Sequence, residues 1–203
     1  MKVKVTNHVD GVEAKIVNHD DETVEIIFSK VGTKSLGSVN PGESVKIGYR
    51  EYIVLDHSAE TTAVISKDIV KKMPFGSDGN YVNSRIMKYL NGEFLRELVS
   101  TIGEDNIVEH TTNLVADDGT GKGECVRSRV SLITTENYRR YREYLPACGS
   151  SWWTATRVTF DEKTGYSRSV CYVSSVGILN WCGYNYENGI RPFCILKSSI
   201  LVS

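Results

Sequence analysis

The sequence predicts an α+β protein, with a small N-terminal β appendage over residues 1–42 and a main domain over residues 43–203. Three patterns support this prediction. Apolar and polar residues alternate near the N-terminus, as they do in half-buried strands. Apolar residues recur every three or four positions from residue 86 to residue 98, as in a helix, and the last quarter is rich in Gly, Ser, aromatic and β-branched residues without a helical period.

The N-terminal appendage is expected to be a β-hairpin. Two segments alternate between apolar and polar residues, and the polar run 18–22 between them favours a turn. A stretch that contains Gly, Ser and Pro, residues 37–42, then interrupts the pattern and places the boundary with the main domain. The alternating apolar positions are Val12, Ala14, Ile16, Val24, Ile26 and Phe28.

The main domain is expected to begin with strands over residues 44–55 and 61–66, followed by a helix that Asn83 or Ser84 caps. The apolar residues of this helix share one face, which we expect to be buried. They are Ile86, Met87, Leu90, Phe94, Leu95 and Leu98.

A second helix is predicted after a polar, glycine-rich loop at residues 116–124 and a short strand near residues 130–133. Thr134 is the expected N-cap, and Pro146 ends the helix. Tyr138, Tyr141 and Leu145 share a face, where packing is the expected role of the tyrosines. The rest of the chain is expected to form strands and long loops.

Charge and hydropathy argue against several classes of partner. The formal net charge is −1 and the basic residues are spread along the chain, so we expect no nucleic-acid binding by a general electrostatic footprint. Residues 169–186 are free of charge but contain too many Ser, Asn, Gly and Tyr residues for a membrane span. The first ten residues contain no apolar run of signal-peptide length, so no export signal is expected.

A search for catalytic and metal motifs predicts no catalytic residue, no metal and no cofactor. The four histidines are scattered, without a GxSxG or HExxH motif. The loop 117–123 lacks the first glycine and the terminal Ser or Thr of a P-loop, and Asp117, Asp118 and Glu124 lack the spacing of an EF-hand. The five cysteines include no CxxC pair, which favours reduced, buried thiols.

Four segments in order resemble a family of phage and bacterial domains without an assigned function. The family pattern is roughly S-x-x-R-x-W-L-N-x-x-F, L-L-S-x-x-E, W-W-L-R-T/S-P and G-V-R-P-A. Here the corresponding segments are residues 84–94, 132–136, 152–156 and 189–193, and the resemblance extends from about residue 47 to residue 196. The segment 154–156 reads Thr-Ala-Thr and lacks the usual arginine and proline, although Arg157 follows.

The resemblance implies a C-type-lectin-like domain, in which two helices pack on twisted antiparallel sheets and late loops form the ligand face. Adjacent Trp152 and Trp153 are expected to point to opposite faces of a strand and to anchor the sheet. Arg191 and Arg85 are expected to be structural, with Arg191 bonded to a carboxylate or to loop carbonyls.

Residues 169–188 resemble antibody-type contact loops in their content of Tyr, Ser, Asn and Gly together with one Trp. Large aromatic rings supply contact area at low entropic cost, and amides supply adaptable hydrogen bonds. A β-rich core with tyrosines at its edges is an equally weighted alternative. The expected ligand-binding residues are Arg157, Tyr172, Asn180, Trp181, Tyr184, Asn185 and Tyr186.

These observations favour a non-catalytic binding module of a phage or prophage, with a protein or carbohydrate ligand and a role in virion structure or host interaction. We expect it to be made in the bacterial cytoplasm, to associate with virions, and to form homo-oligomers through the N-terminal appendage. One alternative is a thiol-dependent enzyme related to formylglycine-generating oxidases, with Cys171, Cys182 and Cys194 as candidates by location. Another is a variable protein of a diversity-generating retroelement.

Overall fold

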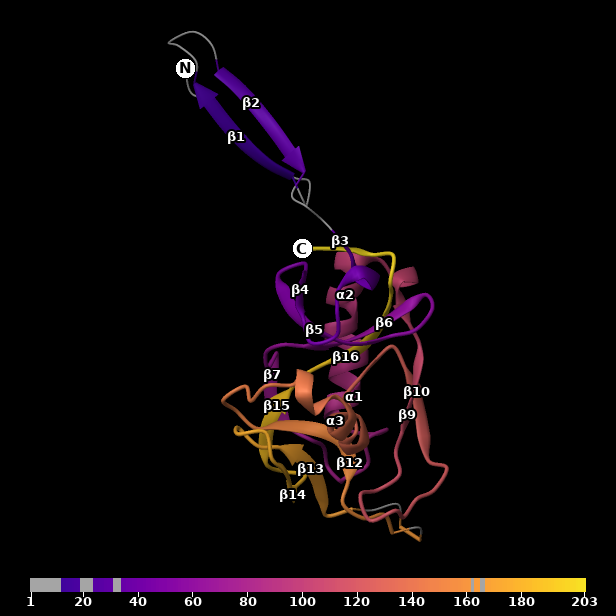
Figure 1. Ribbon diagram of the computed structural model, residues 1–203. Helices are drawn as coiled ribbons and strands as arrows, with labels where there is room; N and C mark the ends of the chain where they lie inside the picture. Colours follow the sequence, from indigo (N-terminus) through magenta and orange to yellow (C-terminus); the bar gives the residue numbers. More distant parts are fainter. Residues whose placement is uncertain (1–11, 19–23, 31–33, 162, 165–166) are drawn as a thin grey trace.

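The computed structural model describes residues 12–18, 24–30, 34–161, 163–164 and 167–203, and it has an α+β architecture in which sheets dominate (Figure 1). Strands β1 (Val12–Asn18) and β2 (Val24–Lys30) form an antiparallel hairpin, with Val12 opposite Lys30. The predicted N-terminal hairpin is therefore confirmed, whereas its expected turn and its first residues lie largely outside the described residues.

A six-stranded sheet has the order β11-β16-β6-β5-β4, and β8 also pairs with β16. The expected strand over residues 44–55 is in fact two strands, because Gly48 adopts a φ of 61° and turns the chain back on itself. The strands are β4 (Ser44–Ile47), β5 (Arg50–His57), β6 (Thr61–Ser66), β8 (Ile107–Val108), β11 (Val130–Ser131) and β16 (Phe193–Lys197).

A five-stranded sheet has the order β14-β13-β12-β15-β7, so β14 and β7 are its edge strands. Its strands are antiparallel except for β12 and β15, which pair in parallel where Trp152 faces Gly189. The strands are β7 (Lys71–Pro74), β12 (Trp152–Arg157), β13 (Ser169–Val173), β14 (Leu179–Gly183) and β15 (Glu187–Ile190).

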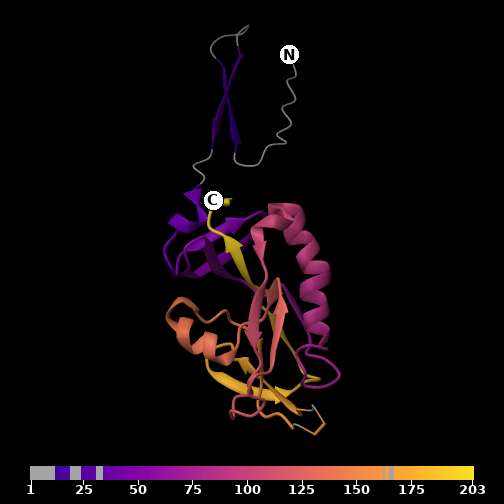
Figure 2. The same ribbon diagram turned by 90° about the vertical axis from the view of Figure 1, so that its right-hand side faces the viewer.

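Two short antiparallel pairs complete the strands of the described residues. β9 (His110–Asn113) pairs with β10 (Cys125–Ser128), and β3 (Lys34–Ser35) pairs with β17 (Leu201–Val202). Short 3-10 turns η1 (Leu36–Ser38) and η3 (Glu104–Asn106) connect elements near these pairs. Figure 2 shows the β9–β10 hairpin standing in front of the two larger sheets.

The first predicted helix is confirmed as one continuous rod of α1 (Arg85–Tyr89), the π-helical segment η2 (Leu90–Phe94) and α2 (Leu95–Ile102). Ser84 is the N-cap, and its Oγ accepts a hydrogen bond from the Met87 N–H at 3.0 Å. Asn91 joins the helix to β11, because its Nδ2 donates to the Val130 carbonyl at 2.9 Å and its Oδ1 accepts from the Val130 N–H at 3.3 Å.

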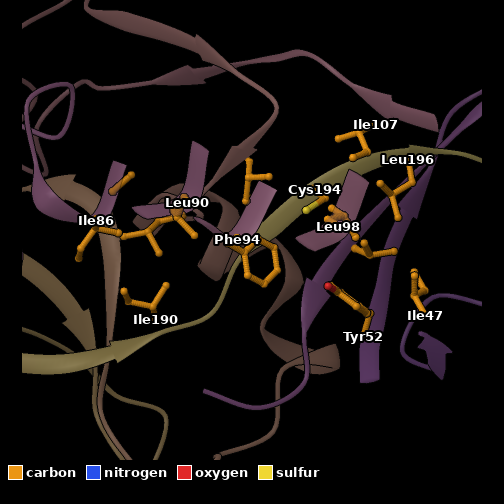
Figure 3. Packing of buried hydrophobic residues seen from close by; sticks show 14 of the residues in the cluster. Ile47, Tyr52, Ile86, Leu90, Phe94, Leu98, Ile107, Ile190, Cys194 and Leu196 are labelled. Carbon is orange, nitrogen blue, oxygen red and sulfur yellow. The ribbon is translucent and has the colours of Figure 1, made fainter. Parts of the chain in front are cut away.

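The apolar face of this helix packs into the larger of two cores, against β16 and the strands beside it (Figure 3). Ile86, Leu90 and Phe94 are buried there, as the periodicity predicts. Leu36 and Val39 belong to the same core, so residues 34–42 pack with the main body rather than with the appendage expected to extend to residue 42.

The second predicted helix is α3 (Thr135–Tyr141), continued by the 3-10 turn η4 (Arg142–Tyr144). Thr134 caps it, with its Oγ1 accepting from the Asn137 N–H at 3.1 Å. The buried rings of Tyr138 and Tyr141 pack in the second core, which lies on the opposite face of the five-stranded sheet from the larger core.

Trp152 and Trp153 point into different cores, as alternation along a strand requires. Trp152 meets the Tyr138 ring edge to face at 5.7 Å, and Trp153 meets the Phe75 ring at 5.5 Å. The indole Nε1 of Trp153 also donates to the Met73 carbonyl at 3.0 Å. The two indoles therefore fix both layers of the fold to one strand.

Candidate binding surface

The free edge of the five-stranded sheet carries the two most exposed aromatic side chains of the late segment. In β14, Trp181 lies opposite Cys171 of β13, and its side chain is 63% exposed. Tyr186, in the turn between β14 and β15, is 64% exposed. Monomeric surfaces seldom gather large apolar side chains without a reason, so this end of the sheet is the first candidate site.

Tyr186 and Trp181 share one face of β14. A Cβ atom added at Gly183 would lie 3.5 Å from the Tyr186 ring and 2.7 Å from Asn185 Oδ1, so both side chains cover the strand at the glycine. Residues 181 and 183 point to the same side of a strand. The absence of a side chain at Gly183 therefore lets the Tyr186 ring settle on the same face as the indole.

Hydrogen bonds stabilise the hairpin between β13 and β14. The Ser174 N–H donates to the Ile178 carbonyl at 2.8 Å, and the Ser174 Oγ accepts from the Ile178 N–H at 3.0 Å. From α3, the Tyr138 hydroxyl donates to the Gly177 carbonyl at 2.8 Å. Val176 and Ile178 are two further exposed apolar residues, and both lie on this supported hairpin.

The backbone edge of β14 is partly closed to another strand. The pairing of Ser174 with Ile178 implies, by alternation along an antiparallel ladder, that the Trp181 N–H points away from β13. Asn180 Oδ1 accepts that N–H at 2.8 Å. This N–H of the edge strand is therefore not available to an added strand.

Only part of the expected contact set lies at this surface. Asn180, Trp181, Asn185 and Tyr186 are exposed there. Tyr172 and Tyr184 are half-buried, and both pack against the larger core. The alternative of tyrosines at the edge of a β-rich core therefore describes these two residues.

Arg157 is not a surface contact residue. Its side chain is buried, with the residue 4% exposed, and its guanidinium stacks on the Phe160 ring at 3.8 Å. Nη2 lies 3.5 Å from the Glu124 carboxylate, while desolvation lowers the pKa of the arginine. A bulge in β12 between Trp153 and Arg157 shifts the register there, so alternation from the tryptophans does not predict where Arg157 points.

Arg191 is buried and bonded to a backbone carbonyl, whereas the Arg85 side chain is exposed. Arg191 is 1% exposed, its Nε donates to the Ser66 carbonyl at 2.9 Å, and its guanidinium lies 5.0 Å from the Trp152 ring. Burial lowers the pKa of Arg191. Arg85 has an exposed side chain that makes no hydrogen bond or ion pair with the described residues, and only its backbone N–H is engaged, with the Phe75 carbonyl.

The candidate thiols are poorly placed for nucleophilic chemistry. Burial raises the pKa of Cys171 to about 12 and that of Cys194 to about 12, and both side chains are buried. Burial also raises the pKa of the half-buried Cys182. A reactive cysteine needs an accessible thiolate, which these surroundings disfavour.

The acidic residues of the loop after β9 bind separate partners. Asp117 accepts from the Thr135 hydroxyl at 3.0 Å and pairs with Arg139, whereas Asp118 accepts from the Thr120 N–H at 3.0 Å. Glu124 pairs with Arg157. Within the described ranges, no three His, Cys, Asp or Glu side chains gather in a way that could hold a metal ion.

Sequence reasoning missed two cavities, of about 250 Å³ and about 270 Å³, that lie beside α3 and β9. The first includes His57, His110 and Tyr141, and the second includes Asp117 and Arg139. Residues from distant parts of the chain line these cavities, so no local sequence motif predicts them. No helix in the described part of the chain is both long and apolar enough to cross a membrane.

Comparison with family models finds one match, to a domain of unknown function (DUF6273), over residues 124–198. This stretch contains β10 to β16 and therefore the whole aromatic edge, but neither the long helix nor β9. Comparison with curated proteins and with solved structures finds no match.

Proposed function

We propose that the protein is a non-catalytic binding module that contacts a partner protein through the aromatic edge, defined as Asn180, Trp181, Asn185 and Tyr186 with Val176 and Ile178. The observation that carries the proposal is the exposure of Trp181 and Tyr186 on one face of a stiff edge strand. The proposal includes a C-type-lectin-like architecture and a phage or prophage source, with a role in virion structure or host interaction. Both rest on the four segments in which the chain resembles phage and bacterial domains.

The composition of the aromatic edge favours a protein over a carbohydrate partner. Large rings with few rotatable bonds are the side chains that dominate the energy of protein interfaces. Val176 and Ile178 add aliphatic area, which suits an apolar protein surface. A sugar site needs several free polar groups, whereas the Asn180 amide oxygen is already bonded to the Trp181 N–H.

The test is a display selection of bacterial protein fragments on the full chain, repeated with Trp181→Ala, Tyr186→Ala and the double variant. Fragments selected by the wild-type chain should lose about a hundredfold or more in affinity for the double variant, since each buried aromatic anchor contributes about 2 kcal/mol. Leu201→Ala is the matched control, because Leu201 is an equally exposed apolar residue on a different sheet.

The variants should remain folded, since both rings are exposed and surface substitutions change stability by about 0.5 kcal/mol or less. Equal binding of the selected fragments to wild-type and double-variant chains would refute the proposed surface. If no protein fragment is selected but the chain binds glycans on an array, and the same variants lose that binding, the surface stands and the choice of partner is overturned.

A further inference from the structure

Residues of both β9 and α3 line two cavities, and we call the space between these two elements the groove. The upper cavity, of about 250 Å³, is lined by Thr111 and Thr112 of β9 and by Asn137 and Tyr141 of α3. No residue of β10 lines it, so β9 is the strand of the hairpin that faces the helix. Figure 2 shows this hairpin standing beside the helix.

The lower cavity, of about 270 Å³, continues the groove toward the loop after β9. Asn113 lines it from the strand side, and Glu136 and Arg139 line it from α3. Asp117 closes this end, because it accepts from Thr135 Oγ1 at 3.0 Å and pairs with Arg139 at 3.0 Å. In the described part of the chain, no hydrogen bond joins β9 itself to α3.

The backbone of β9 offers unpaired groups along this groove. The Leu114 N–H donates to the Glu124 carbonyl at 2.8 Å, which extends the β9–β10 register by one pair. Hydrogen-bonded and non-hydrogen-bonded pairs alternate in an antiparallel ladder, so the N–H and C=O groups of Thr111 and Asn113 point away from β10. These groups have no hydrogen-bond partner among the described residues.

Two side-chain atoms at the upper cavity also lack partners. Thr112 is 5% exposed, and its Oγ1 is buried without a hydrogen bond. His110 Nε2 bonds the Ser131 hydroxyl at 2.8 Å, and its buried Nδ1 has no partner of good hydrogen-bond geometry, although the Val108 backbone lies near the ring. Buried polar atoms are normally satisfied, so unpartnered atoms beside a cavity are available to bond a polar group that enters it.

We infer that the groove binds an extended segment of a partner protein, which adds as a strand to the free edge of β9. A peptide strand presents N–H and C=O groups at alternate residues, which is the spacing of the free groups at Thr111 and Asn113. Oligosaccharides and small molecules have no such repeat. The inference goes beyond the proposed aromatic edge, which is formed by a different sheet.

The walls of the groove indicate which side chains it takes. Residues of the added strand that lie on the same face as His110 and Thr112 enter the upper cavity, which Phe193, Ile195 and Ala63 also line. The cavity carboxylate, Asp56, is already paired with Arg140 at 2.7 Å and accepts from the Tyr141 hydroxyl. The geometry therefore favours an uncharged side chain with an apolar stem and a polar end, such as threonine or tyrosine.

The test uses a displayed library of random short peptides that is selected on the full chain alone, after which the affinity of each selected peptide is measured for Thr111→Pro. Proline at position 111 removes an N–H that faces the groove without removing a bond of the β9–β10 ladder. Arg127→Pro is the matched control, because Arg127 lies directly opposite Thr111 and its N–H faces the other edge of the same hairpin. Circular dichroism verifies that both variants are folded.

Selected peptides should bind Thr111→Pro about tenfold more weakly than they bind Arg127→Pro or the wild-type chain. Amide exchange should slow at Thr111 and Asn113 on peptide binding, but not at Arg127. Binding should survive Trp181→Ala with Tyr186→Ala, so failure here is distinguishable from failure of the aromatic edge. Failure to select any peptide, or an equal loss of binding in the two proline variants, would overturn the inference.

Discussion

Asn91 is the side chain for which the structure makes the sharpest energetic prediction. Its amide bonds both the N–H and the C=O of Val130, a residue with no exposed surface, and so fixes β11 to the long helix. Truncation in Asn91→Ala leaves both backbone groups of Val130 without these partners. We expect this to destabilise the protein substantially.

The magnitude follows from the two bonds. Each bond contributes about 1 kcal/mol net, and the Val130 N–H left unsatisfied costs about 1–3 kcal/mol, whereas the Val130 carbonyl keeps the Ser128 hydroxyl as a donor at 3.2 Å. Alanine regains about 0.5 kcal/mol because it favours a helix more than asparagine does. The expected loss in the free energy of unfolding is therefore about 2–4 kcal/mol.

Chemical denaturation followed by circular dichroism measures this loss, with an unchanged m-value as evidence that the two-state description holds. Lys88→Ala, an exposed change on the same helix, is the control and should alter stability by about 0.5 kcal/mol or less. Asn91→Asp keeps the acceptor but loses the donor to the Val130 carbonyl, so it should also be destabilising. A loss below about 1 kcal/mol in Asn91→Ala would refute the reasoning.

Three further predictions concern buried groups. Burial lowers the pKa of His110 below its usual value of 6.5, so the unfolded chain binds the proton more readily than the folded chain. The free energy of unfolding should therefore fall as the pH drops through about 6.5. His110→Asn should flatten this dependence in denaturation measured from about pH 7.5 to about pH 5.5. Trp153→Phe should lower the free energy of unfolding by about 1.5–3 kcal/mol, because it removes the hydrogen bond to the Met73 carbonyl and leaves a void. An equal loss for Trp181→Phe would contradict the finding that Trp153 is buried and Trp181 exposed. Arg191→Met should change stability by no more than about 1 kcal/mol, since it loses the Ser66 bond but also removes a desolvated charge. Arg191→Ala should lose about 2–5 kcal/mol, because it leaves a cavity. Thermal denaturation of both variants measures these changes.

Local patterns in the sequence were sufficient to predict the helices and the N-terminal hairpin. Helical periodicity and capping depend on neighbours three or four positions away, so Ser84, Thr134 and the buried faces follow from the chain itself. The opposed directions of Trp152 and Trp153 follow equally from alternation along one strand. The strand expected over residues 44–55 failed at one point, where Gly48 makes a turn.

The candidate sites depend on contacts that local patterns do not encode. The sequence indicated an aromatic, amide-rich segment, but Trp181 is exposed and Tyr172 half-buried because β14 is an edge strand while β13 lies inside the sheet. Arg157 looked like a contact residue, yet the bulge in β12 and the Phe160 ring bury it.

By itself, the sequence determined an α+β chain with two capped helices, two anchoring indoles and an uncharged aromatic segment near its end. Only the tertiary structure decided which rings reach the surface and that β9 and α3 enclose a groove with unpaired backbone groups. The physical reason is the separation in sequence between the residues that determine each feature. Helix periodicity and strand alternation act over a few residues, whereas strand order, edges and cavities depend on contacts between separate elements, some of them far apart in the chain, such as the pairing of Ile65 with Phe193.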